Sequence, residues 1–115
     1  MALHHASSGE VVHLGPLGQT LQQARTKALV KTDSFEAIRL VLKAGEELPA
    51  HEVSGKFTLH CIEGKVDLDF NGGSFELAAQ QWVYFDGGVT HALRAIEDSS
   101  LLLTIMLPTT GVGRP

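Results

Sequence analysis

Two histidines, His51 and His91, are the residues of this chain whose type and setting most favour chemistry. Imidazole is a good ligand for zinc, iron, nickel or copper. His51 follows Gly45 and Pro49, which argue against a helix, and it precedes a β-forming run at residues 56–62. We therefore expect His51 on a loop at the mouth of a hairpin, because binding groups concentrate on loops that a sheet supports.

The stretch at residues 45–64, GEELPAHEVSGKFTLHCIEG, resembles the first motif of the cupin superfamily. As in that motif, a histidine follows a glycine after five intervening residues, and the strand that comes next ends at a second glycine. The family usually adds a second histidine two residues after the first, and a glutamate seven residues before the closing glycine. Val53 and Phe57 occupy those two places here, so the ligand set that the resemblance implies is incomplete.

A second stretch, QWVYFDGGVTHALRA at residues 81–95, is similar to the second cupin motif. Its DGG at residues 86–88 stands where the family has Pro-x-Gly, and His91 matches the motif histidine. The usual first glycine and last asparagine are replaced by Gln81 and Ala95. The resemblance implies that both motif histidines point inward near the open end of one barrel.

The rest of the chain has the strand rhythm that such a barrel requires. Short runs with strand character are separated by turn residues, and they lie at residues 25–31, 35–43, 56–62, 65–70, 74–77, 82–85, 90–96 and 101–107. We expect a further short strand at residues 11–14, helical turns at residues 17–24, and a hairpin that pairs residues 65–70 with residues 56–62. Together with the resemblance, this pattern predicts an all-β fold, a double-stranded β-helix (jelly-roll) cupin barrel with at most one short N-terminal helix.

At 115 residues the chain fits one domain with a single core. We predict a flexible N-terminal arm at residues 1–10, a single cupin domain at residues 11–108 and a flexible tail at residues 109–115. The adjacent His4 and His5 are expected to be exposed to solvent rather than to bind a metal, because terminal segments are usually poorly ordered.

Composition limits the partners and the compartment. The formal net charge is -4 and no basic cluster is present, which disfavours a nucleic-acid or anionic-membrane partner. The longest apolar run, at residues 101–107, is far below the roughly 20 residues that a membrane helix needs. Cys61 is the only cysteine, so no intrachain disulfide can form and a reducing compartment is the simpler inference. Because the N-terminus has no charged-then-apolar signal, we expect a cytoplasmic protein.

Strand pleat predicts which side chains line the barrel. If Phe57 points inward, Leu59 and Cys61 do as well, whereas Thr58, His60 and Ile62 point outward. The predicted ligand pocket consists of His51, Val53, Phe57, Leu59, Cys61, Tyr84 and His91. Cys61 is either a small buried hydrophobic residue or a thiolate near His51, and the second role would need a lowered pKa.

Other groups near the motifs have two interpretations each. Trp82, Tyr84 and Phe85 could form the floor of a pocket or belong to an ordinary core or interface. The carboxylates of Glu46, Glu47 and Glu52 could serve as a base or a metal ligand, or could be solvated charges in a loop.

The first functional hypothesis is a single-domain cupin of unassigned reaction that binds a small organic ligand in its barrel. The alternative is a cupin enzyme of the dioxygenase or isomerase type that depends on a divalent transition metal (Fe, Ni, Zn or Mn), with His51 and His91 as ligands. A third hypothesis is a structural protein whose strands serve assembly. In each case we expect a homodimer, because the outward row of Thr58, His60 and Ile62 is largely uncharged.

Overall fold

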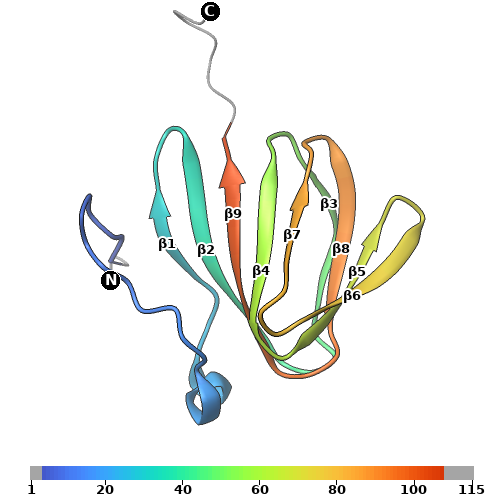
Figure 1. Ribbon diagram of the computed structural model, residues 1–115, viewed down its shortest axis with the longest axis horizontal. Coiled ribbons are helices and arrows are strands. Elements are labelled where there is room, and N and C mark those ends of the chain that lie inside the picture. Colours follow the sequence, from blue (N-terminus) through green and yellow to red (C-terminus); the bar gives the residue numbers. More distant parts are fainter. Residues whose placement is uncertain (1–3, 108–115) are drawn as a thin grey trace, which may run out of the picture.

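The computed structural model describes residues 4–107, except for the side chains of residues 49–53. Nine strands in this part of the chain form two antiparallel sheets that pack face to face (Figure 1). The five-stranded sheet has the order β1 (Lys27–Lys31), β2 (Phe35–Leu42), β9 (Ser99–Met106), β4 (Phe57–Glu63) and β7 (Trp82–Phe85). The four-stranded sheet has the order β3 (Glu47–Val53), β8 (Val89–Ala95), β5 (Lys65–Phe70) and β6 (Gly73–Ala78). This arrangement confirms the predicted all-β double-stranded β-helix.

The N-terminal part confirms one expectation and corrects another. A 3₁₀-helix, η1, spans Gly18–Gln23, within the range expected to form helical turns. The strand expected at residues 11–14 is wrong, because these residues have no regular structure and the Val11 side chain is 87% exposed. A short apolar run forms a strand only where a neighbouring strand supplies hydrogen-bond partners.

The chain changes sheets between β4 and β5. The predicted hairpin between these strands is therefore wrong, since β4 pairs with β7 and β9 whereas β5 pairs with β6 and β8. Gly64 makes the tight turn with a φ of +86°, a conformation that side chains with a Cβ rarely adopt. A Cβ at this position would also lie 2.3 Å from the backbone oxygen of Asp98. The turn at Gly64 is confirmed. Which sheet the next strand joins depends on contacts with residues that are far away in the sequence.

The loop expected around His51 is a strand. β3 pairs with β8, and its register shifts between Leu48 and His51, so the segment that contains Pro49 lies at an irregularity of the ladder. Proline has no N–H to donate, and within sheets it is found at edges and bulges. β3 is an edge strand of its sheet, so a proline can be accommodated there.

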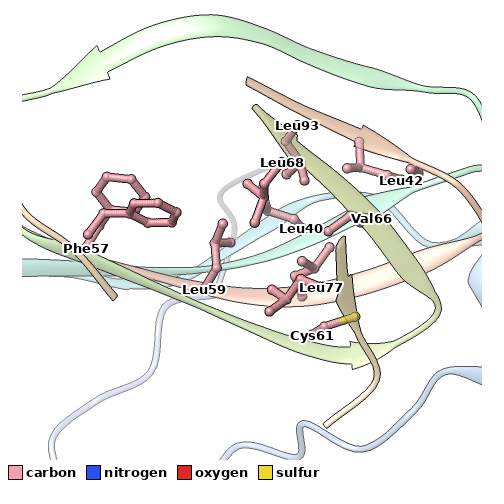
Figure 2. Close-up of a cluster of buried hydrophobic side chains, with 12 residues drawn as sticks. Leu40, Leu42, Phe57, Leu59, Cys61, Val66, Leu68, Leu77 and Leu93 are labelled. Carbon is pink, nitrogen blue, oxygen red and sulfur yellow. The ribbon is translucent and has the colours of Figure 1, made fainter. Parts of the chain in front are cut away.

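The core lies between the two sheets and follows the predicted alternation. In β4, Phe57, Leu59 and Cys61 are 1%, 2% and 0% exposed, and the intervening side chains are less buried. These residues belong to one buried cluster with Val66 and Leu68 of the opposite sheet, which Figure 2 shows. The predicted inward face of β4 is confirmed.

The two predicted terminal segments are only partly described. Residues 4–10 contain no strand or helix, although the Ala6 N–H donates to the Leu29 carbonyl at 2.7 Å. The tail predicted at residues 109–115 lies outside the described residues, and the domain boundaries stay a prediction.

The described residues contain no helix that is long and apolar enough to cross a membrane.

Candidate binding site at the barrel mouth

A cavity of about 540 Å³ lies at one end of the barrel, the upper end in Figure 1, which we call the mouth. One wall is formed by residues 69–72, the end of β5 and the turn to β6, and the other by residues 88–92 at the start of β8. Asn71 and Gly72 form the turn with φ values of 57° and 82°. Asn and Gly tolerate such positive values, so the Asn-Gly pair dictates the tight hairpin that forms this wall.

His91 is the one buried polar residue among the described residues that line this cavity. It lies on β8, it is 6% exposed, and its Nδ1 atom is 3.3 Å from the Val89 carbonyl oxygen. Its ring centroid is 4.5 Å from that of Phe57. The backbone register makes His51 of β3 its direct cross-strand neighbour. The predicted convergence of the two histidine positions is therefore seen in the backbone, while the His51 side chain lies outside the described part.

Two aromatic rings of the five-stranded sheet pack against His91, and two rings of the other sheet continue the cluster. The Phe57 and Phe85 rings, from the five-stranded sheet, stack with their centroids 4.9 Å apart. Phe70 and Phe75, from the other sheet, lie 4.8 Å and 6.4 Å from Phe85. Such distances are typical of interacting aromatic pairs. The rings thus run from the buried core, at Phe57, to the partly exposed Phe75 at the mouth.

The electrostatic character of the cavity is simple. Asp69 is the one charged residue among the described residues that line it, and its neighbours there include the polar Asn71 and Thr90. Asp69 takes part in none of the ion pairs between described side chains. Asp69 alternates with Phe70 along β5, so its side chain lies on the outer face of the sheet, in the groove that also contains Arg94, whereas the Phe70 ring faces the core.

Backbone contacts between loops hold the mouth in shape. A Cβ on Gly87 would lie 2.1 Å from the Ser54 carbonyl oxygen, and one on Gly55 would lie 1.7 Å from the Met106 carbonyl oxygen. Real Cβ atoms are not found at such distances, so only glycine permits these close approaches. The DGG segment of the second motif thus places a glycine where two loops touch.

A group of polar side chains lies beside the mouth, on the outer surface. The Lys56 ammonium contacts the Asp86 carboxylate at 2.9 Å and the Tyr84 hydroxyl at 3.1 Å, and Tyr84 also donates to Asp86. The hydrogen bond from Tyr84, and after it the one from Lys56, lowers the pKa of Asp86. The hydrogen bond to Asp86 is the main cause that raises the pKa of Lys56. The three groups satisfy one another outside the cavity.

The structure therefore divides the predicted pocket residues into three sets. Phe57 meets His91, whereas Leu59 and Cys61 are buried deeper in the core. Tyr84 is 46% exposed on the outer face, so its placement in the pocket is corrected, and the neighbouring Phe85 is the one that points inward. A one-residue difference along a strand moves a side chain to the other face. The side chains of His51 and Val53 lie outside the described part.

Cys61 is a buried thiol. Its Sγ lies 3.4 Å from the Glu63 carbonyl oxygen, and the residue is 0% exposed. Burial raises the pKa of the Cys61 thiol to about 11, because a thiolate would lose its hydration there. The hydrophobic interpretation is favoured over the reactive thiolate, which needs a lowered pKa.

The described residues contain no group of three or more His, Cys, Asp and Glu side chains that could hold a metal. Glu46 accepts the Lys43 N–H at 2.7 Å, and Glu47 lies beside Asp67 in a groove on the outer face of its sheet. His60 is paired with Trp82 and Leu102 across the five-stranded sheet, on the face opposite Phe57. None of these three supplies a third ligand to His91.

Sequence reasoning missed part of the site. Asp69, Phe70 and Asn71 line the cavity, and Phe75 extends the ring cluster. The Asn-Gly-Gly turn after Phe70 was a signal that residues on both sides of it lie at one end of the barrel. What the sequence did not indicate is that this turn lies next to the start of β8.

Comparisons with known proteins bear on the fold. No protein-family model matches the chain, and no curated protein matches its sequence. A conserved protein of unknown function from Streptococcus pyogenes has a similar structure, with 21% identity, a TM-score of 0.72, and coverage of 96% of this chain and 100% of that one. An RmlC-like cupin family protein from Methanocaldococcus jannaschii has 18% identity and a TM-score of 0.71, over 86% of this chain and 94% of that one.

Some similar structures are enzymes. A variant of salicylate 1,2-dioxygenase from Pseudoaminobacter salicylatoxidans has 17% identity and a TM-score of 0.65, over 70% of this chain and 25% of that one. Identities this low show a shared fold and not a shared reaction. The M. jannaschii protein is described as having a double-stranded β-helix fold, and its strands match this chain over most of its length. The chain is therefore a small domain with the double-stranded β-helix fold of the cupins.

Proposed function

We propose that this chain binds a small organic molecule at the barrel mouth, in the cavity between residues 69–72 and residues 88–92. The observation that carries the proposal is the position of His91, beside this cavity and 4.5 Å from the Phe57 ring. Ligand sites are typically concave and largely apolar, with a few polar groups that orient the ligand. At the mouth, Phe70 is the aromatic residue that lines the cavity, and the buried Phe57 and Phe85 rings pack against the His91 imidazole.

Each part of the site would have a separate role. Phe70 offers a partly buried ring to the cavity, and the core rings of Phe57 and Phe85 hold His91 against movement. A side chain that is fixed by packing binds with a smaller loss of conformational entropy. Asn71 and Thr90 add hydrogen-bonding groups at the opening.

Amide NMR of the ¹⁵N-labelled protein with a library of small organic fragments tests the proposal. Shifts should cluster at residues 69–72 and 88–92 for the fragments that bind, and His91→Ala should abolish them. His60→Ala is the matched control, because it removes an imidazole from the outer face of the other sheet. Shifts that cluster elsewhere, or that persist unchanged in His91→Ala, would contradict the proposal.

The alternative is a metal-dependent enzyme, and the register that pairs His51 with His91 favours it. Protein-bound metals usually have at least three protein ligands, and Phe57 has no coordinating atom where the cupin pattern has a carboxylate. Metal analysis of untagged protein tests this alternative. The alternative is supported if each chain binds about one equivalent of metal and the double variant His51→Ala, His91→Ala loses it. Phe57→Glu should then gain affinity for nickel or iron, and no gain would count against it.

We further infer that the chain forms a homodimer through the outer face of the five-stranded sheet. Trp82, Tyr84 and Met106 on this face are 61%, 46% and 44% exposed, and His60 lies between Trp82 and Leu102. Large exposed apolar side chains that adjoin one another are unusual on a monomer. A second copy is the partner that fits, because a twofold axis brings the uncharged side chains of Trp82, Tyr84 and Met106 toward their own copies.

Light scattering at micromolar concentration tests the dimer. The expected mass is twice the 12.3 kDa of one chain. His60→Asp should shift the mass toward that of the monomer, because it places two carboxylates near the axis, whereas Glu76→Asp on the other sheet should not. A mass of one chain for the unsubstituted protein would exclude the dimer.

A further inference from the structure

A second cavity, of about 470 Å³, lies at the lower end of the barrel in Figure 1, where η1 meets the start of β1 and the end of β2. It is lined by Gln22, Gln23, Ala24, Arg25, Thr26, Val41, Lys43 and Glu46. None of these residues lines the cavity at the mouth, so an inference from this site is independent of the proposed function.

The pairing of β1 with β2 places this second cavity on the outer face of the five-stranded sheet. Leu40 belongs to the core cluster, so its neighbours Arg39 and Val41 point to the opposite, outer face. The Arg39 guanidinium accordingly donates to the Gly15 carbonyl, shortly before η1. Val41 is 9% exposed, and it gives the cavity an apolar wall next to residues 22–26.

Two cations line the second cavity without a partner among the described residues. The Arg25 guanidinium and the Lys43 ammonium form no hydrogen bond or ion pair with any described group. The carboxylates close to them have donors already. Glu46 accepts the Lys43 N–H at 2.7 Å, and Asp98 accepts a backbone N–H and the Gln22 amide. Two charged donors are therefore available to a ligand.

A neighbouring pair of cations strengthens the positive charge of this corner. Lys27 of β1 lies directly opposite Arg39 of β2, and like charges in such a cross-strand pair repel each other. The Glu63 carboxylate attracts Arg39, whereas Lys27 takes part in none of the ion pairs between described side chains. An anion bound next to this pair would reduce the repulsion.

We propose that the second cavity binds the phosphate group of a small soluble molecule. An arginine guanidinium can donate two parallel hydrogen bonds to phosphate, and a lysine adds a compact positive charge. The two charges of a phosphate dianion match Arg25 and Lys43, whereas a carboxylate carries only one. The chain's net charge of -4 opposes binding to an anionic membrane surface, which favours a soluble ligand.

Amide NMR titration of the whole chain with inorganic phosphate, at low salt and about pH 7.5, tests the proposal. Sodium acetate at equal ionic strength is the comparison. Phosphate should shift the signals of residues 22–26 and 41–46, and it should bind at least about twofold more tightly than acetate.

Three substitutions with a matched control assign the binding to named groups. Arg25→Gln and Lys43→Gln should each lower the affinity for phosphate about two- to fivefold, whereas Glu46→Gln should raise it about twofold. Lys31→Gln is the control, because it removes a cation that lies opposite Glu36 at the other end of β1. It should leave the affinity unchanged, and the amide spectrum of each variant shows that it is folded.

Three results would overturn the inference. Acetate could bind at these residues as tightly as phosphate, or Lys31→Gln could weaken phosphate binding as much as Lys43→Gln does. The third result is that the chain sediments with phosphatidic acid vesicles, which would identify a lipid headgroup instead of a soluble ligand. Each of these results leaves the proposed function at the mouth untouched, because that proposal depends on other residues.

Discussion

The closed end of the barrel, the lower end in Figure 1, is held together by hydrogen bonds, whereas stacked rings lie next to the mouth. At the closed end, the Glu63 carboxylate accepts hydrogen bonds from the N–H groups of Leu17 and Gly18, at 2.7 Å and 3.1 Å, and from the Ser100 hydroxyl at 2.6 Å. Ser99, which is 0% exposed, donates to the Glu97 carbonyl at 2.7 Å. Because hydrogen bonds weaken with changes in distance and angle, these bonds hold the segments of the closed end in one arrangement.

The mouth instead offers ring surfaces that a ligand can cover. His91 packs on Phe57, while Phe75 is 37% exposed. Stacking surfaces tolerate different partners. The comparison indicates that hydrogen bonds at the closed end secure the fold, and the proposed binding site lies at the other end. Substitutions at the closed end should therefore lower the stability of the fold more than substitutions at the mouth do.

The largest effect is expected at the sheet-switching turn of the closed end. Gly64→Ala places a Cβ 2.3 Å from the Asp98 carbonyl oxygen and at a φ of +86°, so it should lower the free energy of unfolding by about 3 kcal/mol or more. Gly88→Ala at the mouth has a similar φ of +77° but no atom within 4 Å of the added Cβ, so it should cost about 1 kcal/mol. Urea unfolding measures the free energy of unfolding of both variants. Equal losses would contradict the expected difference between the two ends of the barrel.

The next effect concerns Cys61, at the closed end of the core. Because burial raises the pKa of its thiol to about 11 from an ordinary 9.0, iodoacetamide at pH 8 should alkylate the folded protein about 100-fold more slowly than the urea-unfolded chain. Mass spectrometry over time gives both rates. Rapid alkylation of the folded protein would restore the reactive interpretation of this cysteine.

A smaller effect is expected at Glu63. Burial alone would raise its pKa, but the bonds from the Leu17 and Gly18 N–H groups and from the Ser100 hydroxyl outweigh burial and lower it below the ordinary value of 4.5. A carboxyl whose pKa is lowered by folding stabilises the fold above its unfolded pKa, and this contribution disappears as the pH falls through the folded pKa. Glu63→Gln should therefore cost about 1 to 3 kcal/mol at pH 7, and less in acid.

The control for Glu63 is Glu76→Gln on β6, where the carboxylate is 3.9 Å from Lys65 and largely exposed. This substitution should change stability by less than about 0.5 kcal/mol at either pH. Denaturant unfolding at several pH values distinguishes the two variants. If the stability lost in Glu63→Gln is the same in acid as at pH 7, the charge of the carboxylate is not what stabilises the fold.

The smallest effect on stability is expected at the mouth. Phe75→Leu removes a ring that is partly exposed, so it should cost less than about 1 kcal/mol, whereas Leu77→Ala, two positions along the same strand and 4% exposed, should cost about 2 to 5 kcal/mol. Thermal unfolding compares the two variants. A large loss for Phe75→Leu would mean that the mouth also supports the fold.

Much of the local structure could be predicted from residue types. The alternation in β4 indicated that Phe57, Leu59 and Cys61 point inward, and the Asn-Gly pair at residues 71–72 indicated a tight turn. These features depend on residues a few positions apart, and a strand's pleat or a turn's φ is decided at that range. For the same reason the inward position of Phe57 could be predicted.

The sequence by itself determined most of the strands, the tight turns and most of the inward faces of this protein, because pleat and turn conformation are local properties of the chain. Only the tertiary structure decided that β5 leaves the sheet of β4, that Phe85 rather than Tyr84 faces His91, and that the turn at Asn71 forms a wall of the cavity. These outcomes depend on which strands pair across the barrel. Pairing is chosen by the combined burial of side chains far apart in sequence, and no single stretch of residues encodes it.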